Sequence, residues 1–250
     1  MQSRHVGVCV TALVLTALVA ACGGSSAGSP SGAANPATAS PTAVHLEDCV
    51  PASAHARPVS FTAVGEEVHG AEFGSSGSVG VVVAHEYMSN LCGWVDYAQH
   101  LRDLGYRALA FDFGAHLVAD VSAAAGELRR EGATAIVLMG ASMGGTASLM
   151  AAASPSSGVT AVAALSAPSS FMGLDGAGAS STLSIPVLYI AAKDNGEFPV
   201  DARAMYSVCP SAHKQIQILD GSDHGTALLR GDVATQTRSL LDAFVAASIA

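Results

Sequence analysis

Gly140-Ala141-Ser142-Met143-Gly144 is the stretch that decides the fold of this chain. The residues before it, Ala135 to Met139, are apolar and uncharged, which predicts a buried parallel strand. The residues after it, Thr146 to Ala153, predict a helix. A G-x-S-x-G pattern between a strand and a helix is the signature of a nucleophile elbow, whose tight turn needs flanking positions nearly free of side chain. We therefore expect the Ser142 hydroxyl to stand at a helix N-terminus.

The rest of the segment 46–250 alternates short apolar strands with helices, which predicts one domain. A hairpin is predicted at 59–73, strands at 78–84, 106–111, 159–165, 185–191 and 214–219, and helices at 94–104, 118–130, 198–208 and 226–247. This order predicts an α/β fold, with a mostly parallel sheet and helices on both faces. Functional sites of such sheets lie at the carboxyl ends of the strands, where the elbow is also predicted.

A serine needs partners, because its hydroxyl is almost never ionised near neutral pH. It requires a base within hydrogen-bond reach, and the base requires an orienting group. His224 follows the last predicted strand and is the predicted base. Asp194 stands at the tip of the loop after strand 185–191 and is the predicted orienting acid, with an Asx turn or a helix cap as its alternative role. Glu197 is its nearest rival and Asp175 a weaker one.

Two backbone N–H groups are predicted to form the oxyanion hole that acyl chemistry also needs. One belongs to Met143, which follows the predicted nucleophile, and the other to Tyr87, in the loop after strand 78–84. His85 in that loop is interpreted as structural. Glu86 is a possible accessory residue with two open interpretations, a buried carboxylate that modulates the serine or an anchor of the loop.

The segment from Val59 to Ala247 resembles the α/β-hydrolase fold, on the strength of the Ser142 pentapeptide, Asp194 and His224. The loop 83–87 is similar to the dienelactone-hydrolase-like branch of small esterases, in which a glutamate follows the same strand. That branch often has a cysteine nucleophile, where this chain has serine. Many relatives carry Asp-x-Arg-Gly-x-Gly where residues 112–116 here read Asp-Phe-Gly-Ala-His, without the arginine. The short segment before Ile185 leaves no room for a cap domain.

The first residues predict export. Residues 1–21 have a basic start and an apolar run too short to span a bilayer comfortably, which predicts a signal peptide. The run Leu18-Val19-Ala20-Ala21-Cys22 resembles a bacterial lipobox, which implies cleavage before Cys22 and lipidation of that cysteine. The alternative is an ordinary secretory signal cleaved near Ala21. Residues 22–45 are rich in Ser, Gly, Ala and Pro and predict a flexible tether.

Three cysteines remain in the predicted domain, and in an oxidising compartment they predict one disulfide and one free thiol. Cys92 is predicted at the carboxyl edge of the sheet and Cys209 at the opposite edge, which disfavours a bridge between them. Cys49–Cys92 is the preferred pairing, with Cys49–Cys209 behind it.

These observations predict a serine hydrolase of small or medium carboxylic esters, acting as a monomer at the extracytoplasmic face of the membrane through a lipid anchor. No cofactor or metal is expected. The net charge of −9 without a basic patch argues against nucleic acid as a partner. The alternatives are a lipoprotein that keeps the fold and binds without turnover, and an acyltransferase that acts on a cell-envelope acceptor.

Overall fold

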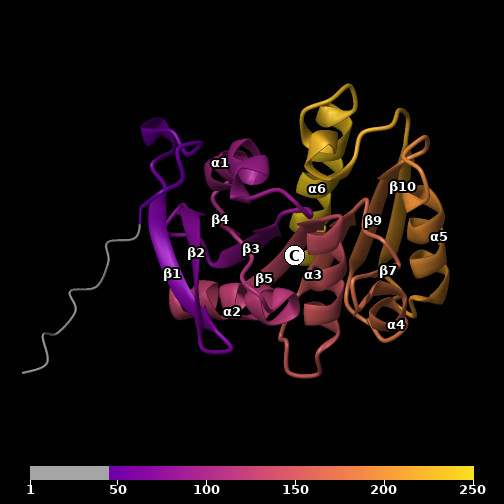
Figure 1. Cartoon of the computed structure of the whole chain (residues 1–250), viewed down its shortest axis with the longest axis horizontal. Coiled ribbons are helices and arrows are strands. Elements are labelled where there is room, and N and C mark those ends of the chain that lie inside the picture. The colour runs from indigo at the N-terminus through magenta and orange to yellow at the C-terminus, as the bar shows by residue number, and fades with distance from the viewer. Residues whose placement is uncertain (1–44) are drawn as a thin grey trace, which may run out of the picture. The chain divides into compact units, whose positions relative to one another are not determined.

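A mixed sheet forms the centre of the computed structural model, which describes residues 45–250 (Figure 1). Its strands are β1 (Arg57–Ala63), β2 (Glu66–Phe73), β3 (Val79–Ala84), β4 (Arg107–Phe111), β5 (Ala135–Ala141), β6 (Ala161–Leu165), β9 (Val187–Ala192) and β10 (Lys214–Leu219). They lie in the order β1-β2-β4-β3-β5-β6-β9-β10. Strand β2 is antiparallel to both of its neighbours, and all the other pairs are parallel. The predicted α/β fold is thus confirmed.

Helices cover both faces of this sheet (Figure 1). They are α1 (Val95–Asp103), α2 (Leu117–Arg130), α3 (Met143–Ala153), α4 (Gly176–Ser180), α5 (Phe198–Val208) and α6 (Ala234–Ser248), with 3₁₀ turns η1 (Ala52–Ala54), η2 (Leu91–Trp94) and η3 (Gly225–Leu229). Between β6 and β9 the chain forms only α4 and a small hairpin of β7 (Ser170–Phe171) and β8 (Leu174–Asp175). In the described part of the chain no cap domain is inserted there, as the short segment predicts.

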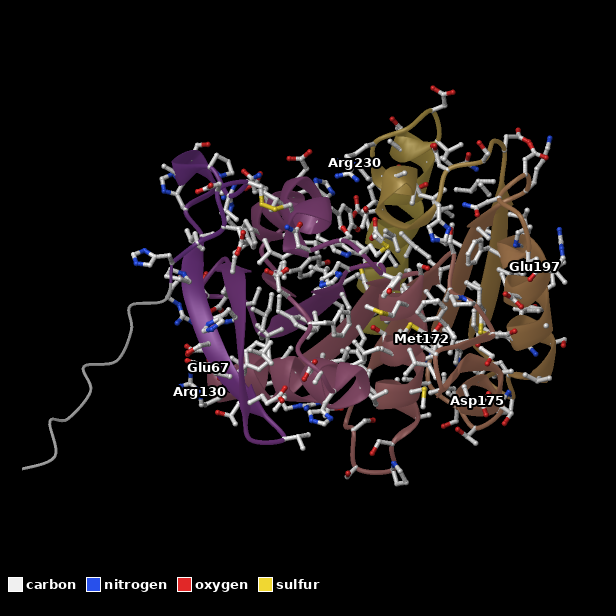
Figure 2. All side chains as sticks on the ribbon, in the orientation of Figure 1. Glu67, Arg130, Met172, Asp175, Glu197 and Arg230 are labelled. Carbon is white, nitrogen blue, oxygen red and sulfur yellow. A yellow bond between two sulfur atoms is a disulfide. The ribbon has the colours of Figure 1, made fainter. Side chains whose placement is uncertain are left out.

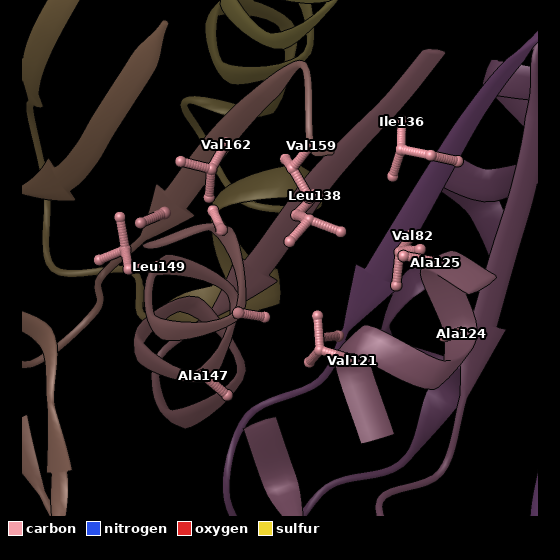
Figure 3. Close-up of a cluster of buried hydrophobic side chains, with 14 of the residues drawn as sticks. Val82, Val121, Ala124, Ala125, Ile136, Leu138, Ala147, Leu149, Val159 and Val162 are labelled. Atoms are coloured by element: carbon pink, nitrogen blue, oxygen red, sulfur yellow. The ribbon is translucent and has the colours of Figure 1, made fainter. Parts of the chain in front are cut away.

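Two cores, one on each face, hold the helices to the sheet. Because strand side chains alternate between faces, Val81 and Val83 pack with α1 and α6, whereas Val82 and Ala84 pack with α2, α3 and α5. Figure 3 shows part of the second core, where aliphatic side chains of α2 and α3 meet those of β3, β5 and β6. Each fully buried Val or Leu side chain stabilises the fold by about 1.5–3 kcal/mol.

The register of the parallel strands gathers four loops at one edge. Ala84 of β3 pairs with Gly140 of β5, so the loop that follows β3 begins beside the elbow that follows β5. Ala192 of β9 pairs with Leu219 of β10, so the loops that contain residues 193–197 and 220–224 also leave the sheet side by side. The sequence-predicted site residues on these loops therefore share one edge of the sheet.

The last predicted helix differs from the structure. Instead of one helix over 226–247, the chain forms η3, turns, and then begins α6 at Ala234. The turn contains Gly231, where an added Cβ would lie 1.8 Å from Oδ2 of Asp223. The Asp223 carboxylate thus occupies the space that a side chain at position 231 would need, and it would have to rotate away to admit one.

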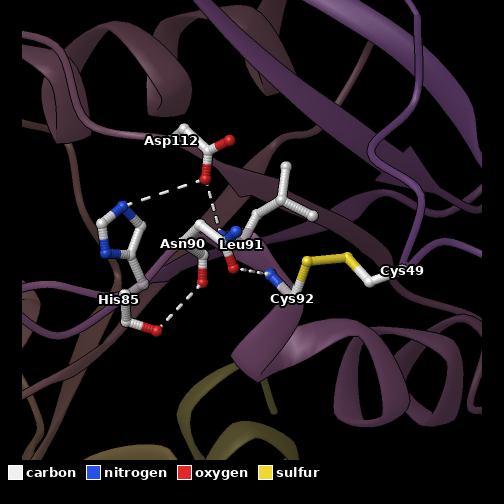
Figure 4. Close-up of a disulfide and its surroundings, with 7 residues drawn as sticks. Cys49, His85, Asn90, Leu91, Cys92 and Asp112 are labelled. Carbon is white, nitrogen blue, oxygen red and sulfur yellow. Dashed lines mark hydrogen bonds and ion pairs between the residues drawn. A yellow bond between two sulfur atoms is a disulfide. The ribbon is translucent and has the colours of Figure 1, made fainter.

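The predicted disulfide is confirmed. Cys49 and Cys92 are bonded, with their Cα atoms 5.7 Å apart, and they tie the N-terminal segment to η2 (Figure 4). Cys209 is a buried free thiol. The predicted signal peptide, the lipidation site Cys22 and the tether, apart from His45, lie outside the described residues. Within residues 45–250 we find no helix that is both long and apolar enough to span a bilayer.

Candidate active site

The turn between β5 and α3 is as tight as the pentapeptide predicts. A Cβ added to Gly140 would lie 2.2 Å from the carbonyl oxygen of Gly144, and one added to Gly144 would lie 2.4 Å from the carbonyl oxygen of Ala84. Neither position therefore accepts a larger residue without moving the backbone. The second contact also seats the start of α3 directly against the end of β3.

Ser142 sits at the apex of this turn in a conformation that is rare for a residue with a side chain. Its φ is +49° and its ψ is −117°. The turn is held because the Ser142 N–H donates to the carbonyl oxygen of Leu165 at 2.7 Å, and the Thr146 N–H donates to the carbonyl oxygen of Ser142 at 3.1 Å. A strained backbone held so firmly is typical of functional positions.

His224 lies half-buried just before η3, and its hydrogen bonds define which ring nitrogen carries the proton. Its Nδ1 is 3.3 Å from Oδ1 of Asn195, while Nδ2 of Asn195 donates to the carbonyl oxygen of Asp223 at 2.6 Å. The second bond fixes the orientation of the amide, so Oδ1 faces the ring as an acceptor. Nδ1 must then carry the proton, which leaves the lone pair on Nε2, as a general base requires.

The structure corrects the predicted partner of His224. Asp194 is exposed, and its backbone N–H donates to the carbonyl oxygen of Gly221, whereas the neighbouring Asn195 is only 8% exposed and contacts the imidazole. The cause is the turn that ends β9, in which the Asn195 N–H donates to the carbonyl oxygen of Ala192 at 3.3 Å. This turn directs residue 195, rather than residue 194, toward the site.

The two alternative acids also lie elsewhere. Glu197 is exposed at the start of α5 (Figure 2). Asp175 caps α4 by accepting a hydrogen bond from the Gly178 N–H at 2.7 Å. The neutral amide of Asn195 therefore stands where the prediction placed a carboxylate.

A carboxylate does approach the site from the loop after β3. Oε1 of Glu86 accepts a hydrogen bond from the Thr226 hydroxyl at 2.6 Å, and Oε2 of Glu86 is buried without a partner. The space around Gly225, the residue after His224, shows where the Glu86 carboxylate lies. A Cβ added there would lie 3.4 Å from Cδ of Glu86 and 3.4 Å from Cβ of Ala141, the residue before Ser142. Glu86 thus lies beside the chain neighbours of both the serine and the histidine.

The two predicted oxyanion donors follow the ends of two strands that pair with each other, β3 and β5. Met143 is the first residue of α3, where a backbone N–H has no acceptor within the helix. Tyr87 follows Glu86, and its ring is half exposed and packs against Phe171 of β7, with centroids 5.6 Å apart. The roles of these two N–H groups stay predictions. Among residues 45–250 no three His, Cys, Asp or Glu side chains gather closely enough to hold a metal ion.

His85, in the same loop as Glu86, lies with its Nε2 4.0 Å from Oδ1 of Asp112 (Figure 4). Its Nδ1 bonds to the carbonyl oxygen of Glu86 at 2.7 Å, and its Nε2 accepts from the Phe113 N–H at 3.2 Å. Asp112 accepts a hydrogen bond from the Leu91 N–H at 2.6 Å. It lies two residues before the position where this chain lacks the arginine of the resembling turn. Both side chains therefore fasten loops, which agrees with the structural role predicted for His85.

The surroundings of His224 lower its pKa below the ordinary value. Burial is the larger cause, and the negative charge of Glu86 opposes it. The Phe198 ring lies against the imidazole, with centroids 4.2 Å apart, and supplies part of that burial. His224 is thus kept neutral, the form in which Nε2 accepts a proton.

Solved structures share this architecture. An esterase from Pyrococcus furiosus superposes with a TM-score of 0.68 at 16% identity, over 82% of this chain and 95% of that one. The esterase domain of a Rhodothermus marinus protein gives 0.63 at 20% identity, over 76% and 97%. A dienelactone hydrolase from Anabaena variabilis gives 0.66 at 17% identity, over 76% and 95%.

The fold is that of the α/β-hydrolases. The eight-stranded sheet, the elbow after β5 and the histidine after β10 are its parts. At these identities the likeness extends to the α/β-hydrolase fold and no further. No family model matches the sequence, and no curated protein matches it either.

Proposed function

We propose that the chain is a serine hydrolase of carboxylic esters. The observation that carries the proposal is that one edge of the sheet holds both Ser142, at φ +49° at the start of α3, and His224, whose bond through Nδ1 leaves Nε2 as an acceptor. Gly225, the residue after His224, lies close to Ala141, the residue before Ser142. A helix N-terminus and a neutral imidazole are what an alkoxide nucleophile needs in order to form. The names of the structurally similar proteins, esterase and dienelactone hydrolase, agree with this chemistry.

In the proposed reaction Oγ of Ser142 attacks the ester carbonyl carbon and Nε2 of His224 takes the hydroxyl proton. The N–H groups of Met143 and Tyr87 hold the oxyanion of the tetrahedral intermediate. The bond to the alkoxide then breaks, the alcohol leaves with the proton from His224, and an acyl-enzyme remains. Water, activated by the same imidazole, releases the acid and restores Ser142. Asn195 keeps the imidazole in the tautomer that both steps need.

The substrate we propose is a small or medium ester. Tyr87 and Met88 follow Glu86, and Met172 follows Phe171, whose ring contacts Tyr87. These three side chains are 52%, 89% and 72% exposed, and no cap domain covers them in residues 45–250. Exposed apolar side chains of this kind suit contact with an apolar acyl or alkyl group that is not enclosed.

A fluorophosphonate probe tests the proposal without a guess at the substrate, because it reacts only with an activated serine. The purified domain is labelled and the modified peptide is identified by mass spectrometry. We expect the label on Ser142, and we expect Ser142→Ala to abolish both labelling and turnover of a p-nitrophenyl ester series. A folded domain that takes up no label would instead support a protein that binds without turnover.

We also propose that the enzyme is anchored by lipid on Cys22 outside the cytoplasm. The support is the lipobox-like run before Cys22 and the disulfide Cys49–Cys92, since such bonds persist in oxidising compartments. In a bacterial host, the full-length chain is expected in the membrane fraction and Cys22→Ser in the soluble fraction. Equal distribution of the two would contradict the anchor.

A further inference from the structure

The site lacks a negative charge where the orienting group meets the base. In a serine–histidine–acid arrangement the acid both holds the tautomer and stabilises the imidazolium that forms during the reaction. Asn195 does the first through its Oδ1, but a neutral amide has no charge with which to do the second. The imidazolium of His224 therefore needs its counter-charge from another residue.

Glu86 is placed to supply it. Gly225 joins His224 to η3, and an added Cβ there would meet Oε2 of Glu86 at 3.5 Å. That oxygen is buried and has no hydrogen-bond partner among residues 45–250. A buried carboxylate oxygen left unpaired is costly, and a charge that appears next to it during a reaction offsets that cost.

Two consecutive hydrogen bonds, from Arg230 to Thr226 and from Thr226 to Glu86, set the orientation of Glu86. Nη2 of Arg230 donates to the Thr226 hydroxyl oxygen at 3.1 Å, and the Thr226 hydroxyl donates to Oε1 of Glu86 at 2.6 Å. Because the arginine occupies the acceptor side of the hydroxyl, the proton of Thr226 points to the carboxylate. This bond fixes Oε1 and leaves Oε2 free on the side of Gly225.

The other charges near His224 are turned away or paired. The Asp223 carboxylate lies against Gly231, and the Lys193 ammonium pairs with Asp220 at 3.1 Å. None of the ion pairs formed by residues 45–250 includes Glu86. Arg230 reaches Glu86 only through the Thr226 hydroxyl. Glu86 thus lies beside Gly225, the residue after the base, without a direct ion pair among the described residues.

We infer that this chain divides the work of one acid between two side chains: Asn195 aims the imidazole of His224, and Glu86 supplies the negative charge that stabilises its protonated form. The inference rests on the proposed function. Glu86 acts through His224 and touches no reacting atom, so it is a positioning residue. This role differs from both interpretations that the sequence left open for Glu86, because the carboxylate acts on the histidine rather than on the serine and does more than anchor the loop.

Glu86→Gln tests the charge while keeping the shape of the side chain. The rate constant for fluorophosphonate labelling of Ser142 is measured against pH for the wild type and the variant. We expect the plateau rate to fall by about tenfold or more, since the imidazolium loses its counter-charge. We also expect the acid limb of the profile to move to lower pH, since a histidine without that charge gives up its proton more readily.

Two further variants complete the test. Asn195→Asp restores a carboxylate at the ring, so in the Glu86→Gln background it should recover labelling and return the acid limb toward the wild-type pH. Glu67→Gln removes an exposed glutamate from β2 and should change neither quantity. Circular dichroism confirms that each variant is folded.

A folded Glu86→Gln variant whose acid limb stays at the wild-type pH would overturn the inference, because a loop anchor alone would lower the rate without moving the limb. The inference also fails if Asn195→Asp gives the Glu86→Gln variant no recovery. A wild type that never labels would instead contradict the proposed function, so the two failures are distinguishable.

Discussion

His85 and His224 stand at the same edge of the sheet and differ in how many ring nitrogens are occupied. Both nitrogens of His85 bond to backbone groups of Glu86 and Phe113, and the side chain is almost fully buried. His224 bonds through Nδ1 alone and is half-buried. The first ring has no lone pair left for chemistry, whereas the second does. The comparison shows that the count of free nitrogens, rather than proximity to the serine, separates a structural histidine from a base.

The largest expected effect comes from removing the free nitrogen. His224→Ala should lower kcat by about 10⁴-fold or more while the fold is retained, because no other group takes the Ser142 proton. In the wild type the pKa of His224 is lowered by burial. Labelling should therefore persist below the pH at which an ordinary histidine becomes protonated, and be lost as pH falls further. A His224→Ala variant with near-wild-type turnover would remove His224 from the mechanism.

The next effect concerns the loops on the His85 side. Cys92 lies in η2, next to Leu91, whose N–H donates a hydrogen bond to Asp112. The Cys49–Cys92 bond spans 43 residues, and a loop of that length stabilises the fold by about 4 kcal/mol in the chain-entropy account. Cys49→Ser/Cys92→Ser should lower the unfolding midpoint in urea accordingly. Reductant should lower the wild type to the same midpoint and leave the double variant unchanged.

The orienting contact of His224 should have a smaller effect on activity. Asn195→Ala removes the acceptor that holds the tautomer, and we expect kcat to fall by about 100-fold. Asp194→Ala, one residue earlier and exposed, is the matched control and should change kcat less than about threefold. The reverse order of effects in steady-state assays would restore Asp194 as the orienting group.

The smallest expected effect is on stability alone. His85→Ala leaves the Phe113 N–H without its acceptor, which should lower the free energy of unfolding by about 2 kcal/mol. His213→Ala, at an exposed position, should change it by less than about 0.5 kcal/mol. Urea denaturation measures both. If His85→Ala abolished labelling of Ser142 in a folded protein, the distinction between the two histidines would fail.

The elbow could be predicted residue by residue because its constraints are local. Gly140 and Gly144 are dictated by carbonyl oxygens a few residues away or on the adjoining strand end, and the apolar run before them defines the strand. The disulfide Cys49–Cys92 could also be predicted, because the positions of the strands leave few partners for each thiol.

The orienting group could not be predicted in the same way. Asp194 and Asn195 are adjacent, and the choice between them depends on one hydrogen bond from the Asn195 N–H to Ala192. No periodicity in the sequence marks that turn. The break between η3 and α6 is similar, because it is formed by turn hydrogen bonds such as that from the Ala234 N–H to the carbonyl oxygen of Gly231. In both cases the deciding contact is a polar one within a loop, where hydrophobic patterns carry no information.

Strand β10 pairs with β9 alone, and this bears on when activity appears as the chain folds. Strand β10 is one of the two edge strands of the sheet, and the loop after it carries His224. The elbow is complete some eighty residues earlier in the chain. A nascent or truncated polypeptide that has formed β3 and β5 thus holds a serine without a base. Competence to react should arise only when the last strand docks, so recovery of labelling during refolding is expected to follow edge-strand pairing rather than collapse of the core.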